Sequence, residues 1–285
     1  MKRIGITADC VCDLPEEYLA VHDIDIVYFY IKTDTGRFRD RYEITSENII
    51  EYLERGGNKA ETFEPTPGEY KEFFENSLKK YDEIIHICIS SFVSGSTRNA
   101  AAALELMGDN GKRVYVIDSW HLSTGMGHMI IKAVEMRDRQ TSVDEITTEM
   151  ESMRNKVSSS FITRSADYLY RNGRAGKRVR DITEMFSLHP VLCMKDGKMA
   201  VKSIKAGNYD RAVLKYIKSE LRHNKKIDMK RLFITHACCS AKTIADVKQL
   251  VNKYCEFDEV IVTKASATVS GNCGPGAIGV LYVNK

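Results

Sequence analysis

Hydroxyl side chains and a glycine are concentrated at residues 90–98 (Ser-Ser-Phe-Val-Ser-Gly-Ser-Thr-Arg), and this stretch offers the clearest chemistry in the chain. The mostly apolar residues 83–89 before it predict a buried strand, and the alanine- and leucine-rich residues 99–107 after it predict a helix. Such a turn leaves backbone N–H groups unpaired at the positive end of the helix dipole. We therefore expect an anion site at Ser94, Gly95 and Ser96, for a phosphate or a carboxylate.

Two other predicted strands also end in small polar residues. Asp9 follows the strand at 3–8, and Asp118-Ser119 follows the strand at 113–117. Open parallel sheets bind ligands beyond the carboxyl ends of their strands, so these residues and Ser90 are expected at one crevice. An equally open reading is that Asp9 and Asp118 only serve turns or helix starts.

The pattern of elements predicts an α/β protein with two domains, residues 1–156 and 157–285, and a ligand between them. In the first domain strands alternate with helices, which favours a parallel sheet covered on both faces. The second domain reads as α+β with a mostly antiparallel or mixed sheet, and Asp196-Gly197 predicts a hairpin turn. Expected strands are 3–8, 25–31, 84–89, 113–117, 159–163, 191–194, 199–204, 231–235, 259–263 and 277–283, and expected helices are 46–55, 69–81, 99–107, 121–137, 211–221 and 242–254. Helix starts are expected at Asp13, Thr66 and Ser142, each with a glutamate three residues on.

Composition excludes several classes of function. The chain of 285 residues carries 42 basic and 39 acidic side chains, a balance that argues against nucleic acid or an anionic membrane surface as partner. No apolar run reaches the roughly 18–20 residues of a membrane helix, and the first residues enter a strand without a signal-peptide core, so we expect a cytoplasmic protein. The eight cysteines include no zinc-type CxxC pair and are expected to be reduced, with no metal bound.

Two further glycine-containing stretches stand out. Residues 271–276 (Gly-Asn-Cys-Gly-Pro-Gly) precede a strand, so they are not a dinucleotide-binding fingerprint. They form either a tight segment whose backbone approaches another group closely or a plain turn. Residues 171–178 are basic, and Arg174 either pairs with a carboxylate or phosphate or is solvated. No Walker loop, GxSxG elbow or HExxH helix is present, and the sequence assigns no histidine to Ser94.

Taken together, these stretches resemble the DegV family along essentially the whole chain. Order and spacing carry the resemblance, through Asp9-Cys10, Thr62-Phe63-Glu64-Pro65, Ser94-Gly95-Ser96, Asp118-Ser119, Gly173-Arg174 and Asn272-Cys273-Gly274-Pro275-Gly276.

The resemblance implies a two-domain bacterial protein that encloses one long-chain fatty acid, without a cofactor or metal and without catalytic activity of its own. It also implies a partner, the ATP-using subunit of bacterial fatty acid kinase, to which the carboxylate is presented for acyl-phosphate formation. Thr62 and Ser94 would hold the carboxylate with amides near Gly95 and Ser96, and Arg174 would lie by the head group or at the kinase surface. The expected ligand-binding set is completed by Asp118, Ser119, Asn272 and Gly274.

Some residues depart from the family pattern. Asn272 stands where the family usually has histidine, and Glu64 would repel a carboxylate if it lay near the site. Lipid binding tolerates such changes more easily than phosphate transfer does. Two other readings stay open, a hydrolase or acyl/phosphate-transfer enzyme that uses Ser94, and a small-anion or sugar-phosphate sensor on the same loop. The remaining departures are Phe63, Cys10, Cys12 and Thr97.

Overall fold

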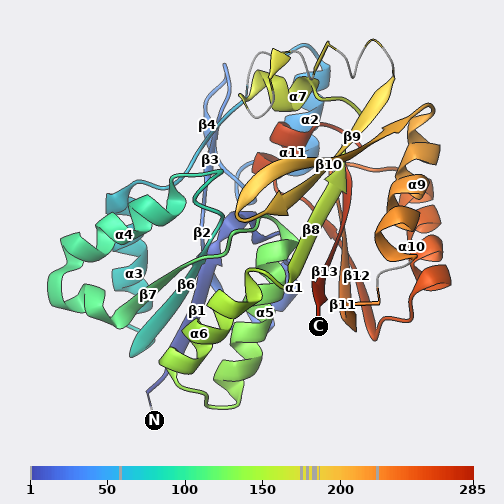
Figure 1. The fold of residues 1–285 in the computed structure, drawn as a ribbon. Helices are drawn as coiled ribbons and strands as arrows, with labels where there is room; N and C mark the ends of the chain where they lie inside the picture. Colours follow the sequence, from blue (N-terminus) through green and yellow to red (C-terminus); the bar gives the residue numbers. More distant parts are fainter. Residues whose placement is uncertain are drawn as a thin grey trace.

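The first sheet has four parallel strands in the order β2-β1-β6-β7 (Figure 1). The computed structural model describes residues 2–57, 60–173, 176–177, 180–181, 185, 187–222 and 225–285. The winding reverses between β1 and β6, which places the switch point of the sheet at Asp9 and at the residues that follow Cys88. The strands are β1 (Ile4–Asp9), β2 (Asp25–Val27), β6 (Glu83–Cys88) and β7 (Val114–Asp118).

Helices cover both faces of this sheet because successive strand residues point to opposite sides. On one face Ile84 packs with Tyr70 and Phe74 of α3 (Pro67–Ser77) and with the alanines of α4 (Ser96–Met107). On the other face Ile85 packs with residues of the remaining helices. These are α1 (Glu16–Val21), α5 (Thr124–Asp138) and α6 (Val143–Met153); short 3-10 turns span η1 (Cys10–Cys12) and η2 (Gly108–Arg113).

The second sheet is mixed, with six strands in the order β10-β9-β8-β13-β11-β12. Only the β11–β12 pair among these is parallel. Helices α9 (Tyr209–Leu221) and α10 (Ala241–Tyr254) cover one of its faces. The strands are β8 (Val157–Ile162), β9 (Leu188–Lys195), β10 (Lys198–Ala206), β11 (Ile227–His236), β12 (Glu259–Lys264) and β13 (Ile278–Asn284).

Helix α5 lies between the two sheets (Figure 1). One core contains Met126 and Ile130 of α5, Ile87 of the first sheet, and Phe233 and Leu281 of the second. Residues 124–131 of α5 are therefore all buried, since each side of the helix meets a sheet. This arrangement joins the two sheets through one continuous apolar core.

A third, small sheet lies beside the carboxyl ends of the first. It consists of β3 (Tyr30–Lys32), β4 (Arg37–Arg39) and β5 (Glu61–Phe63) in the order β4-β3-β5. Helix α11 (Ala267–Cys273) packs against α2 (Ser46–Glu54), and α7 (Asp167–Arg171) packs against α11. These short elements bring distant parts of the chain to the end of the parallel sheet (Figure 1).

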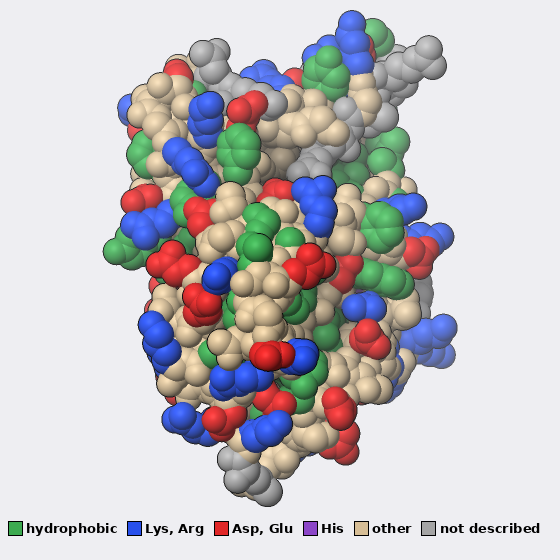
Figure 2. Space-filling model, turned by 90° about the vertical axis from the view of Figure 1, so that its left-hand side faces the viewer, with side chains coloured by type: hydrophobic (Ala, Val, Ile, Leu, Met, Phe, Trp, Pro, Cys, Tyr) green, Lys and Arg blue, Asp and Glu red, His purple; other side chains and the backbone are tan. Residues whose placement is uncertain are grey.

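The α/β class, the parallel first sheet and the mixed second sheet confirm the predictions from sequence. The capping boxes at Thr66 and Ser142 are also confirmed, because each hydroxyl accepts from, and each backbone N–H donates to, the glutamate three residues on. Among the described residues, none of the helices combines the length and apolar character that crossing a membrane requires. Basic and acidic side chains are interspersed over the face formed by α3 and α4 (Figure 2).

Two local predictions for the first 31 residues are wrong. Residues 25–31 are not one strand, because the chain leaves the parallel sheet after Val27 and joins the small antiparallel sheet at Tyr30. At the break, the Phe29 N–H donates to Cys10 Sγ at 3.2 Å, which holds the chain against η1. Asp13 does not cap α1, since it has a positive φ of 54° and Pro15 precedes the helix.

Candidate functional site

A cavity with polar residues in its wall lies at the switch point of the parallel sheet. We call it the polar cavity. The loop after β6 contributes Ser94, the strand β5 contributes Thr62, and α11 contributes Asn272. The structure thus brings together three of the residues that the sequence predicted for ligand binding. Its wall consists of Phe29, Thr62, Glu64, Ile89, Val93, Ser94, Leu122, Leu169, Met199, Thr268, Val269, Asn272 and Cys273.

The loop after β6 fixes Ser94 by local hydrogen bonds. The Ser94 N–H donates to the Ser90 carbonyl at 3.1 Å, which forms a tight turn. Ser94 Oγ accepts from the Ser96 N–H at 3.2 Å. Because this contact uses an oxygen lone pair, the Ser94 O–H proton is left to donate to a ligand oxygen.

The Glu64 carboxylate also lies in this wall, beside the same loop. Its Oε1 accepts a hydrogen bond from the Gly95 N–H at 3.1 Å. The Asn99 side chain donates to the Pro65 carbonyl at 2.9 Å and holds the segment after β5 against α4. The Gly95 N–H, which the sequence predicted for an anionic ligand, is therefore already bound to a carboxylate of the chain.

Ser96 does not line the polar cavity but belongs to a buried network around Asp9. Asp9 Oδ2 accepts from Ser96 Oγ at 2.5 Å and from the Ile89 N–H at 2.8 Å. Asp9 Oδ1 accepts from Tyr70 Oη at 2.6 Å and lies 3.3 Å from His86 Nε2. Asp9 therefore fixes both ends of the loop that carries Ser94.

The same network includes a group with metal-ligand atoms, Asp9, His86 and Cys88, whose candidate ligand atoms lie within 4.8 Å of one another. Burial raises the pKa of the Cys88 thiol well above its ordinary value, so it stays protonated. The Asp9 oxygens already accept from several donors. The group therefore has the chemistry of a hydrogen-bonded network, which leaves no reason to assign a metal to it.

Two buried carboxylates hold α11 in the wall of the cavity. Asp40 accepts from the N–H groups of Ala267 and Thr268 at 2.8 and 2.9 Å. Asp13 accepts from the Ser266 N–H at 2.8 Å and from Ser123 Oγ at 2.5 Å. Burial raises the pKa of Asp40 and raises that of Asp13 to about 7, although these hydrogen bonds oppose the shift.

Asn272 faces the cavity from the last turn of α11. Its Nδ2 donates to the Thr268 carbonyl at 2.8 Å. One N–H and the acceptor oxygen Oδ1 of the amide are left for other contacts.

The other predicted site residues lie outside the cavity wall or outside the described residues. Asp118 Oδ1 accepts hydrogen bonds from the N–H groups of Ser91 and Trp120, so it holds the start of the loop after β6 without lining the cavity. The Ser119 side chain is buried in its own turn. Gly274 ends α11 with a φ of 82°, and Arg174 is not among the described residues.

A second cavity, which we call the apolar cavity, lies between the start of α5 and the second sheet. Four hydroxyl side chains belong to its wall, but each has a hydrogen-bond partner of its own. Ser123 binds Asp13, Ser159 binds His121, Ser160 binds Tyr216, and Thr235 binds Thr124 and Thr263. The surface left to a ligand is therefore almost entirely apolar. Its wall consists of Leu122, Ser123, Ser159, Ser160, Phe161, Met194, Thr235, His236, Ala237, Ala265, Val269, Cys273, Ala277, Ile278, Gly279 and Leu281.

The two cavities share three wall residues, Leu122, Val269 and Cys273. These side chains lie between a polar chamber and an apolar one, and we call them the neck. A ligand that extends through the neck would meet hydroxyl and amide groups at one end and hydrocarbon at the other. This arrangement suits an amphipathic molecule with a small polar head.

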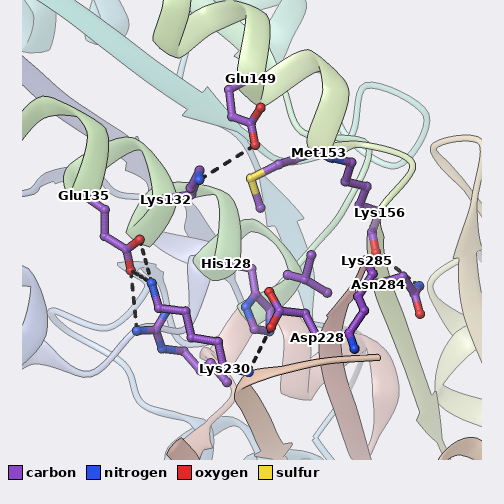
Figure 3. A pocket seen from close by; sticks show the side chains of 12 residues that line it. His128, Lys132, Glu135, Glu149, Met153, Lys156, Asp228, Lys230, Asn284 and Lys285 are labelled. Carbon is purple, nitrogen blue, oxygen red and sulfur yellow. Dashed lines mark hydrogen bonds and ion pairs between the residues drawn. The ribbon is translucent and has the colours of Figure 1, made fainter. Parts of the chain in front are cut away.

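Another pocket lies at the ends of α5 and α6 beside β11, and it is lined by charged residues (Figure 3). Lys230 Nζ lies 2.7 Å from Glu135, and Lys132 lies 3.9 Å from Glu149. His128 is buried there with its pKa lowered to about 4 and is therefore neutral at pH 7. A wall of ion pairs offers no surface for an apolar tail, so we do not assign a lipid to this pocket.

Several residues of the two cavities were not identified from the sequence. The helix α11 supplies Thr268 and Val269, and it was not predicted: residues 271–273, which were expected in a loop or turn, form its last turn. The signal that was missed is Ser266, a capping residue whose Oγ accepts from the Val269 N–H. Leu169 and Met199 reach the polar cavity from distant elements. No local sequence signal distinguishes such apolar residues from ordinary core residues.

Comparisons with known proteins agree with this architecture. The chain matches the family model described as "Uncharacterised protein, DegV family" over residues 3–285. A DegV domain-containing protein of Caldanaerobacter subterraneus is 27% identical over 289 residues, and one of Clostridium acetobutylicum is 27% identical over 288 residues. In both comparisons the match covers 100% of this chain and 100% of the relative.

Solved structures share the fold over almost the full length. A fatty-acid-binding DegV family protein of Thermus thermophilus superposes with a TM-score of 0.87 at 24% identity, covering 99% of this chain and 100% of the other. A stearic-acid-binding protein of Eubacterium ventriosum gives a TM-score of 0.85 at 24% identity, covering 100% and 99%. A DegV family protein of Eubacterium eligens, loaded with heptadecanoic acid, gives 0.86 at 21%, covering 99% and 100%. The family match and the shared fold together show that this chain belongs to the DegV family.

Proposed function

We propose that this protein binds one long-chain fatty acid, with the head group in the polar cavity and the tail through the neck into the apolar cavity. The observation that carries the proposal is the shared wall of Leu122, Val269 and Cys273, which joins a chamber of hydroxyl and amide groups to an apolar one. The fatty acids bound by DegV family proteins of the same fold support the same ligand class.

The polar cavity is proposed to orient the head group. Ser94 and Thr62 donate their hydroxyl protons to the head-group oxygens, and Asn272 contributes its amide. A carboxylate that leaves water needs such donors, because an unpaired buried charge costs far more than a hydrogen bond returns. Hydrogen bonding in this chamber therefore determines which end of the lipid the chamber holds.

The tail is proposed to supply most of the affinity. Each buried methylene contributes roughly 0.8 kcal/mol, so a sixteen-carbon chain gains on the order of 10 kcal/mol before the costs of association are subtracted. Because the hydroxyl groups around the apolar cavity are already paired, tail burial there does not cost a protein hydrogen bond.

We further propose that the protein is not itself an enzyme and presents its fatty acid to a separate kinase subunit, as the family resemblance implies. In that reaction the carboxylate oxygen attacks the γ-phosphorus of ATP, ADP leaves, and an acyl phosphate forms. Among the described residues, the polar contact that fixes Ser94 Oγ is the Ser96 N–H, not a base, which argues against Ser94 as a nucleophile. A burst of product from a chromogenic ester, stoichiometric with protein and lost in Ser94→Ala, would restore the enzyme reading.

The first test is native mass spectrometry of freshly purified protein, followed by organic extraction of any adduct. We expect a single adduct of fatty-acid mass at one per chain. Protein that stays free of lipid after incubation with palmitate, stearate and oleate would overturn the proposal. If the protein contains no lipid and phosphate displaces its bound ligand, the anion-sensor reading is favoured instead.

A further inference from the structure

We infer that Glu64 makes the polar cavity select long-chain lipids with an uncharged, hydrogen-bond-donating head group over the same lipids with an ionised carboxylate. The inference rests on the proposed lipid binding and concerns the head group alone: palmitate remains a ligand, but an uncharged derivative of it binds more tightly. A confirmed preference would therefore count against the presentation of a carboxylate to a kinase, and not against lipid binding. It concerns Glu64 in its contact with Gly95, where the chain places a carboxylate of its own at an anion position.

The position of Glu64 is fixed from both sides. Before it, Thr62 of β5 pairs with Ile31 of β3. After it, the Asn99 side chain holds the Pro65 carbonyl at 2.9 Å, and Thr66 begins α3 with a capping box. The Glu64 carboxylate can leave the Gly95 N–H only by side-chain rotation, since the backbone on either side is held.

A carboxylate ligand would meet an unfavourable environment in this chamber. Ser94 directly precedes Gly95, whose N–H donates to the Glu64 carboxylate. A ligand that is hydrogen-bonded to the Ser94 hydroxyl therefore shares a small cavity with the Glu64 charge. Two carboxylates in one partly buried site repel each other unless one takes up a proton. The ligand would also find the Gly95 N–H already used.

An uncharged donor head group meets complementary partners instead. A primary amide or a hydroxyl donates to the Glu64 carboxylate, and such a charge-assisted hydrogen bond is stronger than a neutral one. Its oxygen accepts from Ser94 Oγ, whose proton is left free by the contact with Ser96. Asn272, with Nδ2 already on the Thr268 carbonyl, adds an acceptor oxygen.

One cation of the described residues approaches the same point. A Cβ placed on Gly95 would meet both Glu64 Oε1 and Arg98 Nη2, so the Arg98 guanidinium from α4 lies on the same side of this backbone atom. Arg98 is exposed, and water screens its charge more than it screens the partly buried Glu64. It reduces the repulsion without removing the carboxylate from the chamber.

The test compares two lipids that differ only in head-group charge, palmitate and hexadecanamide, on delipidated protein at about pH 8, where a free carboxylic acid is ionised. Displacement of a fluorescent long-chain probe gives both dissociation constants. We expect hexadecanamide to bind at least tenfold more tightly than palmitate. In Glu64→Gln, which keeps an oxygen for the Gly95 N–H, this ratio should fall at least tenfold.

Two control variants separate the local charge from general effects. Glu61→Gln removes the same charge from β5 outside the cavity wall and should leave the ratio unchanged. Arg98→Gln removes the nearby cation and should increase the ratio. A wild-type preference for palmitate, or an unchanged ratio in Glu64→Gln, would overturn the inference while the proposed lipid binding stands. Failure of both lipids to bind would overturn the proposed function and the inference with it.

Discussion

Ser96 Oγ donates a 2.5 Å hydrogen bond to Asp9 Oδ2, which joins the start of α4 to the end of β1. The same carboxylate oxygen accepts from the Ile89 N–H at 2.8 Å. Asp9 therefore closes residues 89–96 into a ring whose far side carries Ser94. Asp9, which lies outside the wall of the polar cavity, thus sets the position of Ser94, the proposed hydrogen-bond donor to the ligand.

Ser96→Ala is expected to weaken fatty acid binding several-fold although Ser96 lies outside the cavity wall. The lost bond to a charged acceptor should also lower the free energy of unfolding by about 1–3 kcal/mol. Titration of delipidated protein and urea unfolding measure the two effects. Ser91→Ala, in the exposed part of the same loop, should change neither; equal lipid affinity in Ser96→Ala and wild type would refute the positioning role.

Ser94→Ala is expected to bind palmitate roughly tenfold more weakly, because a hydrogen bond to a charged head group contributes about 1.5–3 kcal/mol. The fold should remain intact, since Ser94 Oγ contacts only a local N–H among the described residues. Thr62→Ala should act in the same direction, and the double variant more strongly. Retained lipid at wild-type level in Ser94→Ala would remove Ser94 from the site.

Much of this fold follows from local sequence signals. The strand 84–89, the turn at 90–95 and the helix after it were predictable, because an apolar run, a Ser/Gly turn and an alanine-rich run each have strong local preferences. The capping boxes at Thr66 and Ser142 were predictable for the same reason. Thr62, Ser94 and Asn272 were assigned to one site through the family resemblance, and they do share one cavity.

Long-range contacts explain what was not predictable. Asp13 has the sequence context of a helix cap, but it binds Ser266 across 253 positions of the chain. Residues 25–31 look like one strand, but the two halves join different sheets because Phe29 is held by Cys10. The identity of the neck residues depends on how α5 and α11 meet, which no local pattern records.

Val269→Phe is expected to narrow the neck and to discriminate between lipids by length. Palmitate affinity should fall at least tenfold, because the tail can no longer reach the apolar cavity, whereas octanoate should lose much less. Val201→Phe, which adds the same ring on exposed β10, is the matched control. Equal losses for both acids would place the tail elsewhere.

Asp13 gives the last prediction, because its pKa of about 7 in the folded protein compares with an ordinary value of 3.8. Between these values the folded state holds a proton that the unfolded state has lost, so this group lowers the free energy of unfolding as pH rises from about 4 to 7. The full cost above pH 7 is on the order of 4 kcal/mol. Asp13→Asn keeps an acceptor oxygen for the Ser266 N–H, and its Nδ2 can donate to Ser123 Oγ, without the charge.

The stability of Asp13→Asn relative to wild type should therefore increase through this pH window and then level off. Buried His121 and His128, with pKa values lowered to about 4, act with the opposite sign between about pH 4 and 6.5, but they contribute equally to both proteins and cancel in the difference. Urea unfolding at several pH values measures that difference, with Asp109→Asn, an exposed carboxylate, as the flat control. A difference that does not change with pH would mean that Asp13 is ionised in the folded protein throughout, and that the start of α11 is held by a charge.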